Sequence, residues 1–414
     1  MERATPGLAV LLLLAAGCGL GTEPGDRPDG PGPLITELPR SLTPAESAAI
    51  EAGNRFAFDL LDEVLVDARD ESVFLSPFSA FMALGMTMNG ARGTTFDAMR
   101  ATLRFDGMEL DEINEAYAEL LGLLENVDPQ VEFAVGNAVW HRAGVPVRES
   151  FRDRVEEGFR ARVEGLDFES PAAAQTMNAW ARDVTRDRID GIVDPPIPSN
   201  VMAYLMNATY FKAGWREPFD PDLTRTDDFH LPDGSTASAE FMVRDDTVGF
   251  YQGDGWRAVD LPYAGGAWSM TVVVPEGSRT VQDLIGELDA EGWDALVDGL
   301  ETGRVMVQLP RFELEWEGVL NDPLVRLGMG PAFGGGADFS GMFEEAGAWI
   351  DEVKQKSFVR VDEEGTEAAA VTSVVMVTSM PPEVRADRPF LFALRERLSG
   401  TILFMGVIQE PPTL

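Results

Sequence analysis

The order of the predicted elements constrains this chain most, because helical patterns dominate its first half and strand patterns its second half. A helix is predicted from Thr43, since this threonine, Pro44 at the first helical position and Glu46 together form a capping box. A second helix carries one apolar face, made of Ile113, Tyr117, Leu120, Leu121 and Leu124. Alternating or continuous apolar runs predict strands at 268–274, 305–309, 312–316 and 401–407. This segregation indicates an α+β fold rather than a repeating βαβ layout.

Composition excludes several classes of function. With 70 acidic and 33 basic residues, the net charge of −37 disfavours partners such as nucleic acid, anionic lipid and heparin-like polyanions. Only two histidines are present, His141 and His230, which removes most zinc sites and most Ser/Cys–His hydrolase mechanisms. We therefore expect no metal and no cofactor. The single cysteine, Cys18, rules out an internal disulfide, so the fold depends on packing.

The N-terminus has the pattern of a targeting segment. Residues 8–16 are apolar and too few to span a bilayer as a helix, so residues 1–17 are predicted to be a signal peptide. The junction at Cys18 resembles the lipobox of bacterial lipoproteins, which implies a lipid anchor on that cysteine. The alternative is an ordinary signal peptide with an incidental cysteine. Residues 18–41 are rich in Gly, Pro and Asp and are predicted to be a flexible linker that precedes a domain at 42–414.

A long neutral stretch precedes Pro381-Pro382. Between Ala368 and Met380 it holds no charge, no Gly and no Pro, which argues against simple disorder. In an extended chain, small or apolar residues would share one face at Thr366, Ala368, Ala370, Thr372, Val374 and Met376. Such a segment can thread into a sheet without removing a ladder hydrogen bond or burying a charge. The alternative is a permanent core strand, but Glu363, Glu364 and Gly365 are more typical of a hinge.

Motifs spread along the chain, in consistent order, resemble the serpin family. They are Phe74-Leu75-Ser76-Pro77-Phe78-Ser79 and the segments 205–212, 214–219, 309–312, 327–329, 337–342, 361–370 and 386–392. The resemblance covers residues 42–412. It implies three β-sheets, eight or nine helices and an exposed reactive-centre loop. Together with the lipobox at Cys18, it suggests a bacterial, lipoprotein-type member. Serpins are an established example of proteins whose own loop adds a strand to a sheet.

The resemblance also implies roles for individual residues. The loop hinge would comprise Glu363, Glu364, Gly365, Thr366, Glu367, Ala368, Ala369 and Ala370. A buried cluster beneath the opening sheet would comprise Ser76, Ser79, Asn207 and Gln355, the last standing where the family has a histidine. Trp215 would lie at the top of the sheet, where the loop first enters.

The position of the cleaved bond depends on the direction of counting. The family spacing of seventeen residues from Glu363 gives Ser379–Met380, whereas counting back from Pro381 gives Thr378–Ser379. Neither bond follows a basic residue, so the implied target is an elastase-, chymotrypsin- or subtilisin-like serine protease.

The function implied by the resemblance is that of a suicide substrate rather than an enzyme. The protease would cut the loop, become trapped as an acyl-enzyme and form a covalent complex with a monomeric inhibitor. Together with the lipobox, this predicts a secreted protein tethered to a bacterial membrane through Cys18, in the periplasm or outside the cell. A non-inhibitory serpin that acts as a binding protein is the alternative. A hydrolase with Ser76 as nucleophile is disfavoured, because no Gly-x-Ser-x-Gly motif is present.

Overall fold

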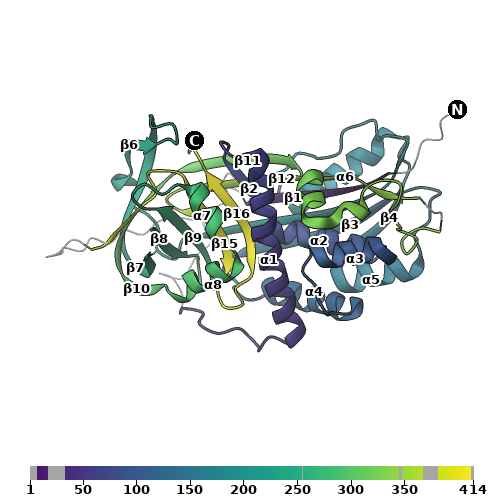
Figure 1. The fold of residues 1–414 in the computed structure, drawn as a ribbon, viewed down its shortest axis with the longest axis horizontal. Coiled ribbons are helices and arrows are strands. Elements are labelled where there is room, and N and C mark those ends of the chain that lie inside the picture. The colour runs from purple at the N-terminus through teal and green to yellow at the C-terminus, as the bar shows by residue number, and fades with distance from the viewer. Residues whose placement is uncertain (1–6, 17–32, 254, 345–346, 367–380, 412–414) are drawn as a thin grey trace.

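The computed structural model describes residues 7–16, 33–253, 255–344, 347–366 and 381–411. Figure 1 shows helices α2 to α5 on one side of α1, together with β3 and β4 of the large sheet, and strands β6 to β10 on the other side. The described residues form nine α-helices, which agrees with the eight or nine expected. They are α1 (Pro44–Asp67), α2 (Pro77–Met88), α3 (Gly93–Thr102), α4 (Leu110–Leu124), α5 (Glu149–Phe159), α6 (Pro171–Val184), α7 (Val281–Glu287), α8 (Ala290–Asp298) and α9 (Asn321–Leu324).

Helix α1 begins where the capping box predicts. The Thr43 hydroxyl accepts a hydrogen bond from the Glu46 amide at 3.1 Å, and the Glu46 carboxylate accepts one from the Thr43 amide at 2.7 Å. Two of the amides that a helix leaves unpaired at its start are thereby satisfied. Helix α2 differs from α1 in having every residue buried, because it lies inside the core with sheets on either side.

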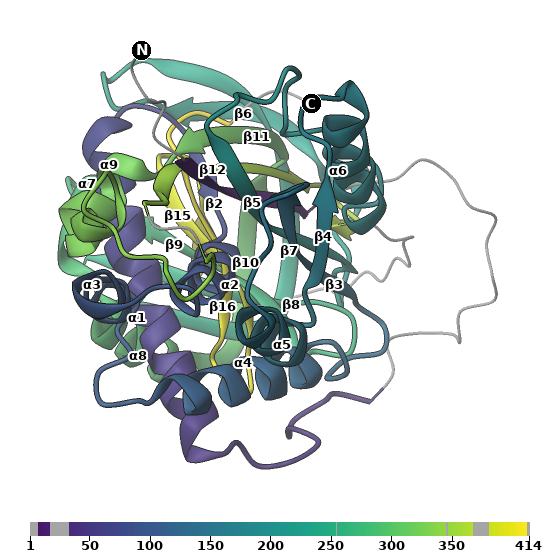
Figure 2. The same ribbon diagram turned by 90° about the vertical axis from the view of Figure 1, so that its right-hand side faces the viewer.

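The large sheet has the strand order β11-β12-β1-β5-β3-β4, with the two-residue strand β13 paired to β5. Helix α6 covers its outer face, on the opposite side from α1 (Figure 2). Met177 of α6 packs there with Trp140 and Met206 from the sheet, in a core separate from the main one. The strands are β1 (Gly7–Ala16), β3 (Glu132–Arg142), β4 (Arg162–Leu166), β5 (Val201–Gly214), β11 (Phe312–Val319), β12 (Trp349–Val361) and β13 (Gly365–Thr366).

The remaining strands form one network in the order β14-β10-β7-β8-β9-β15-β16-β2, with β6 also paired to β7. The network divides at the long strand β7 into a part with β6, β10 and β14 and a part with β8, β9, β15, β16 and β2. With the large sheet, this gives the three sheets expected. The strands are β2 (Val73–Leu75), β6 (Arg225–His230), β7 (Thr236–Gly253), β8 (Trp256–Pro262), β9 (Trp268–Pro275), β10 (Glu301–Pro310), β14 (Glu383–Arg385), β15 (Phe390–Glu396) and β16 (Ile402–Ile408).

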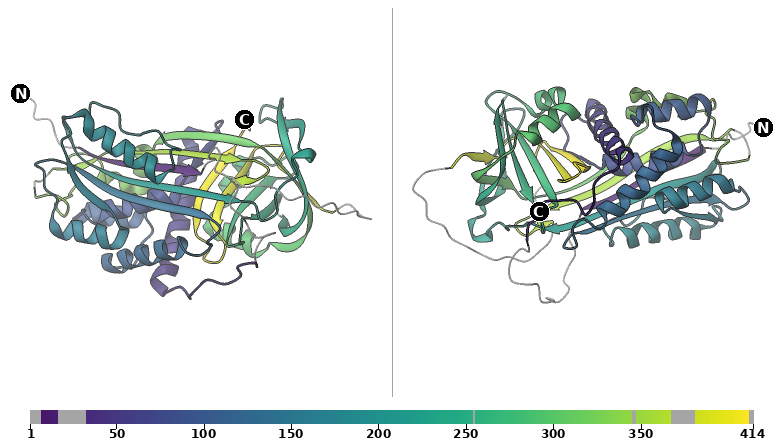
Figure 3. Two further views of the ribbon diagram at one scale, coloured as in Figure 1. Left: turned by 180° about the vertical axis from the view of Figure 1, so that it is seen from behind. Right: turned by 90° about the horizontal axis from the view of Figure 1, so that it is seen from below.

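The middle of the large sheet holds the N-terminal strand β1. Its backbone pairs in parallel with β5 from Gly7 to Ala16 and with β12 on its other side, so β1 separates β5 from β12 (Figure 3). Residues 7–16 belong to the predicted signal peptide. A short apolar run satisfies the requirements of a signal sequence and of a buried strand equally well. The position between β5 and β12 therefore accommodates an additional strand.

Candidate functional site

The first part of the candidate site is the cluster at the start of α2. Ser76 caps this helix: its hydroxyl accepts a hydrogen bond from the Ser79 amide at 3.1 Å and donates one to the Leu403 carbonyl at 2.6 Å. The Gln355 side chain, from β12, bonds both backbone groups of Ser76, accepting from its N–H at 3.2 Å and donating to its carbonyl at 3.0 Å. The amide of Gln355 thus fastens β12 to the buried end of α2.

Strand β5 is fastened to the same helix end through Asn207. The Ser79 hydroxyl donates to the Asn207 side-chain carbonyl, which also accepts from the Thr209 hydroxyl at 3.0 Å. The Asn207 amide donates in turn to Asn137 on β3 at 2.8 Å. The structure therefore brings together Ser76, Ser79, Asn207 and Gln355, and all four are fully buried.

This arrangement is uncharged and well paired. Every bond in it joins neutral groups, so separating or shifting β5 and β12 would leave no buried charge without a partner. The geometry also argues against Ser76 as a nucleophile, because its hydroxyl is fully buried and already hydrogen-bonded to the backbone. Neither histidine is part of the cluster.

The second part of the site surrounds Trp215, just beyond the end of β5. Its ring is 4% exposed and stacks on Tyr263, with centroids 4.4 Å apart and an interplanar angle of 10°. Its indole N–H donates to the Asp362 carbonyl at 2.9 Å, and its backbone N–H donates to the Glu364 carbonyl at 3.0 Å. Trp215 therefore lies directly against the predicted hinge.

The predicted hinge pairs with the large sheet at Gly365. Gly365 and Thr366 form β13, which pairs antiparallel with Gly214 and Ala213 of β5. Gly365 has φ +128°, and a Cβ on it would come within 2.6 Å of the Gly214 Cα. Only glycine fits both the backbone angle and the space at this position.

Of the two acidic residues of the predicted hinge that the structure describes, Glu363 is buried, with 7% exposure, and Glu364 is exposed. Its carboxylate accepts a hydrogen bond from the Thr224 hydroxyl at 2.5 Å and lies 3.5 Å from the Arg311 Nε. Its backbone carbonyl accepts from the Phe219 amide at 2.9 Å. Sequence reasoning missed Thr224 and Arg311 as partners, although Arg311 lies inside one of the motifs used for the resemblance.

A buried arginine next to this hinge was also missed. Arg244 of β7 stacks on the Phe219 ring at 4.6 Å and pairs with Asp246 at 3.1 Å. Burial lowers the pKa of Arg244, while the nearby carboxylates of Asp246 and Glu217 oppose that shift. No local sequence pattern marks this residue, because its burial depends on contacts between distant segments.

Several predicted site residues lie outside the described part of the chain. They are Cys18, Glu367, Ala368, Ala369, Ala370, Thr378, Ser379 and Met380. The described chain stops at Thr366 in β13 and resumes at Pro381 before β14, which pairs in parallel with β10.

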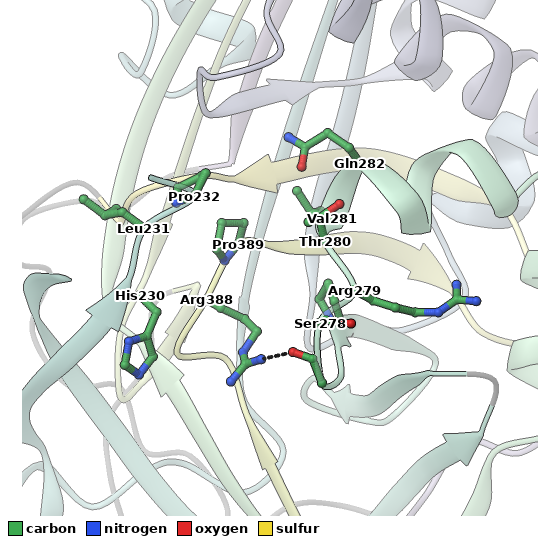
Figure 4. A pocket seen from close by; sticks show the side chains of 12 residues that line it. His230, Leu231, Pro232, Ser278, Arg279, Thr280, Val281, Gln282, Arg388 and Pro389 are labelled. Carbon is green, nitrogen blue, oxygen red and sulfur yellow. Dashed lines mark hydrogen bonds between the residues drawn. The ribbon is translucent and has the colours of Figure 1, made fainter. Parts of the chain in front are cut away.

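A surface hollow of about 450 Å³ lies away from the hinge, between the β6–β7 turn, the segment before α7 and the loop before β15 (Figure 4). Its arginines already have partners: Arg388 contacts Asp387 and the Gly277 carbonyl, and Arg279 pairs with Glu287 at 2.6 Å. The hollow therefore offers little uncompensated charge to an anionic ligand.

The described residues contain no group of three or more His, Cys, Asp or Glu side chains placed to hold a metal ion. Among their helices, none combines the length and apolar character needed to cross a membrane.

Comparison with known proteins agrees with this geometry. The family model described as serpin (serine protease inhibitor) matches residues 51–411. The chain is 33% identical to an uncharacterised serpin-like protein of Thermococcus kodakarensis, with 99% of each chain covered. It is 32% identical to Iripin-1 of Ixodes ricinus, covering 87% of this chain and 94% of that protein.

A solved structure gives the same result for the fold. Human thyroxine-binding globulin in complex with thyroxine superposes with a TM-score of 0.80 at 25% identity, covering 89% of this chain and all of that chain (100%). The motifs, the three sheets and the family match are mutually consistent. The chain therefore belongs to the serpin family.

Proposed function

We propose that this chain inhibits serine proteases as a suicide substrate, with Ser379–Met380 as its reactive bond. The observation that carries the proposal is the direction of β13. Strands β5 and β12 both run parallel to β1, whereas β13 enters antiparallel to β5 at its end. Continuing the β13 register would place Ala368 opposite Phe211, and Phe211 is the residue that pairs with Ala16 of β1. An inserted loop and β1 would thus compete for the same edge of β5.

Removal of the predicted signal peptide resolves that competition. Cleavage before Cys18 would take β1 away and vacate the position between β5 and β12. The loop could then occupy it after proteolysis, with Thr366, Ala368 and Ala370 on one face. Small, uncharged residues suit this position, because a charge there would have to be buried.

The chemistry belongs to the protease. Its serine attacks the Ser379 carbonyl, the bond to Met380 breaks, and the new amino terminus leaves with the C-terminal fragment. An ester then links the protease serine to Ser379. Strand insertion carries the attached protease away and distorts its active site. Slowing hydrolysis of this ester about a millionfold requires the loss of roughly 8 kcal/mol of transition-state stabilisation.

The neutral cluster at α2 suits this motion. Gln355 and Asn207 hold β12 and β5 through amide and hydroxyl groups, which can exchange hydrogen-bond partners as the strands separate. We propose that the cluster acts as the gate of the sheet and that Trp215 marks the point of entry. The absence of a basic residue at the reactive bond favours an elastase-, chymotrypsin- or subtilisin-like target.

The decisive experiment uses the chain from residue 18 with Cys18→Ser, incubated with elastase, chymotrypsin and subtilisin. Denaturing gels and mass spectrometry should show a denaturation-resistant adduct and a released fragment that begins at Met380. A fragment that begins at Ser379 would move the bond to Thr378–Ser379. Clean cleavage with the protease still active would contradict inhibition of those targets.

Two hinge variants provide a matched control. Ala368→Glu places a charge on the face that insertion would bury, whereas Ala369→Glu places the same charge on the opposite face. We expect Ala368→Glu to be cleaved without forming an adduct, while Ala369→Glu retains most of the trapping. Equal loss in both variants would contradict the proposed orientation of the inserted strand.

The second candidate is a non-inhibitory serpin that acts as a binding protein. It is favoured by the likeness to thyroxine-binding globulin, a serpin whose structure holds a small ligand. Cleavage without an adduct, for every protease tested, would select this function.

We also propose that the protein is a secreted monomer anchored by a lipid on Cys18, with its folded domain held off a bacterial membrane. Mass spectrometry of the N-terminal peptide from the native protein tests this. A lipid-modified Cys18 that disappears in Cys18→Ser is the expected result, and an unmodified Cys18 would contradict it.

A further inference from the structure

The last part of the predicted linker lies against the folded domain. The Ile35 amide donates a hydrogen bond to the Gly265 carbonyl at 2.8 Å, and the Ile35 side chain packs on the main core. Further along, the Arg40 guanidinium bonds Glu46 at 2.7 Å and Glu119 at 2.8 Å. Residues 33–41 are therefore attached to the domain at both ends.

Two glycines leave the space that Leu34 and Ile35 occupy. A Cβ on Gly265 would lie 2.8 Å from the Ile35 Cδ1 and 2.7 Å from an Asp128 carboxylate oxygen. Gly266 has φ +89°, and a Cβ on it would overlap the Leu34 Cδ1. The turn at 263–267, which joins β8 to β9, thus has a surface on which two apolar side chains rest directly on the backbone.

The same turn supports Trp215 from behind. Tyr263 stacks on the indole of Trp215, and the Ala264 amide donates to the Gly214 carbonyl at 2.9 Å. The Arg216 guanidinium donates to the Ala264 carbonyl at 3.1 Å. A displacement of the turn would therefore disturb residues 214–216.

Residues 214–216 hold the hinge. Gly214 pairs with Gly365, and the Trp215 amide donates to the Glu364 carbonyl at 3.0 Å. The contacts form a continuous series from Leu34 and Ile35, through the turn, to the point where the reactive loop enters the sheet. Leu34 takes part through the close approach of its side chain to Gly266, and the steps from Ile35 onward are direct hydrogen bonds or ring contacts.

We propose that Leu34 and Ile35 brace the turn at 263–267 and thereby hold the entry point of the large sheet against insertion of the loop beyond Thr366. Release of these two residues loosens Trp215 and lowers the barrier to loop insertion. Leu34 directly follows the Gly- and Pro-rich part of the linker, so a pull on the chain before residue 34 reaches this contact before the Arg40 ion pairs. The consequence for inhibition rests on the proposed suicide-substrate function, whereas the coupling between the two sites does not.

The test compares Ile35→Asp with Thr36→Asp in the chain from residue 18 with Cys18→Ser. Both variants add one carboxylate at neighbouring positions, but Ile35 is partly buried against the core and Thr36 is exposed. Hydrogen exchange followed by mass spectrometry reports on the turn through the Gly266 amide and on the entry point through the Trp215 and Arg216 amides.

We expect Ile35→Asp to speed exchange at both places by roughly tenfold, as local opening becomes easier, and Thr36→Asp to match the parent chain. For an inhibitor, Ile35→Asp should also shorten the half-life of inhibitory activity on warming, because the uncut loop inserts sooner. The milder Ile35→Ala keeps the comparison available if the aspartate variant folds poorly.

Faster exchange at Gly266 with no change at Trp215 and Arg216 would overturn the proposal, since the turn would then move independently of the entry point. Unchanged exchange at both places would overturn it as well. Failure to trap any protease would contradict the inhibitory function and leave the exchange comparison intact, so the two failures are distinguishable.

Discussion

The large sheet and the neighbouring sheet both contain buried polar side chains, but those of the large sheet form a neutral cluster and those of the neighbouring sheet form a charged centre. At the large sheet, Gln355 and Asn207 are held by uncharged hydrogen bonds. In the other sheet, Asp260 of β8 pairs with Arg395 of β15 at 3.0 Å and with Arg397 at 3.2 Å, and Thr271 of β9 bonds the same carboxylate.

The difference follows from what each sheet has to do. A buried ion pair is expensive to break, because a separated charge is left in a low-dielectric environment. Such pairs suit strands that remain together. Neutral amides and hydroxyls lose much less on separation, which suits the sheet that we propose to open. Stacked aromatic rings also stabilise the sheet that contains Asp260, where Phe74 of β2 packs on Phe404 of β16 with centroids 5.3 Å apart.

The largest expected effect comes from Asp260→Ala. Arg395 is 3% exposed, so removing its partner leaves a buried cation uncompensated. We expect the free energy of unfolding to fall by about 3–5 kcal/mol, measured by urea denaturation. Asp245→Ala is the control, because it breaks a more exposed pair with Arg304 and should cost less than about 1 kcal/mol. Equal losses would remove the distinction between the two kinds of centre.

The next effect should come from Gln355→Leu. This change removes both side-chain hydrogen bonds to Ser76 and leaves a buried N–H and carbonyl with fewer partners. We expect a loss of about 2–3 kcal/mol in the same denaturation experiment, smaller than that of Asp260→Ala. Ser357→Ala, on the same strand, removes one hydroxyl that donates to the Phe74 carbonyl and should cost about 1 kcal/mol. A loss from Gln355→Leu as large as that from Asp260→Ala would show that neutrality does not make this cluster easier to disrupt.

A smaller effect is expected at the hinge. Glu363→Ala removes a buried carboxylate that bonds Thr224 and approaches Arg311, so the free energy of unfolding should fall by about 1–2 kcal/mol. Glu364→Ala removes the same charge from an exposed neighbour and should change it by less than about 0.5 kcal/mol. Thermal unfolding followed by circular dichroism measures both variants, and a larger shift for Glu364→Ala would contradict the assignment of Glu363 as the anchored residue.

The smallest expected effect is the pH dependence of the contribution that Asp260 makes to the free energy of unfolding. Burial raises the pKa of Asp260, but Arg395 and Arg397, helped by hydroxyl donors, outweigh it and hold that pKa below its ordinary value of 3.8. A carboxyl whose folded pKa is depressed contributes stability above its unfolded pKa and loses it as the pH falls through the folded value. The difference in stability between the parent chain and Asp260→Asn should therefore be constant from pH 7 to about 5 and shrink below 3.8. The difference in stability between the parent chain and Gln355→Leu should not change over the same pH range. A change with pH would reveal a charged group within the neutral cluster.

Local patterns in the sequence determined a large share of this structure. The capping box at Thr43, the strands now seen as β9, β10, β11 and β16, and the α+β arrangement depend on residues close together in the chain. Hydrophobic periodicity and capping are local properties, so the sequence alone specifies them. The motifs that resemble serpins were equally local.

Only the tertiary structure decided which distant residues meet. Gln355 bonds Ser76 across 279 positions, and Asn207 bonds Ser79 across 128. Thr224, just before β6, and Arg311, between β10 and β11, converge on Glu363, and Ile35 reaches Gly265 on the turn behind Trp215. Residues 7–16 show most clearly what a local pattern leaves undecided, because a short apolar run is consistent with both a signal peptide and a central strand. Local sequence sets what a segment is able to form, whereas the partners that satisfy its hydrogen bonds and charges are fixed when the sheets and helices assemble.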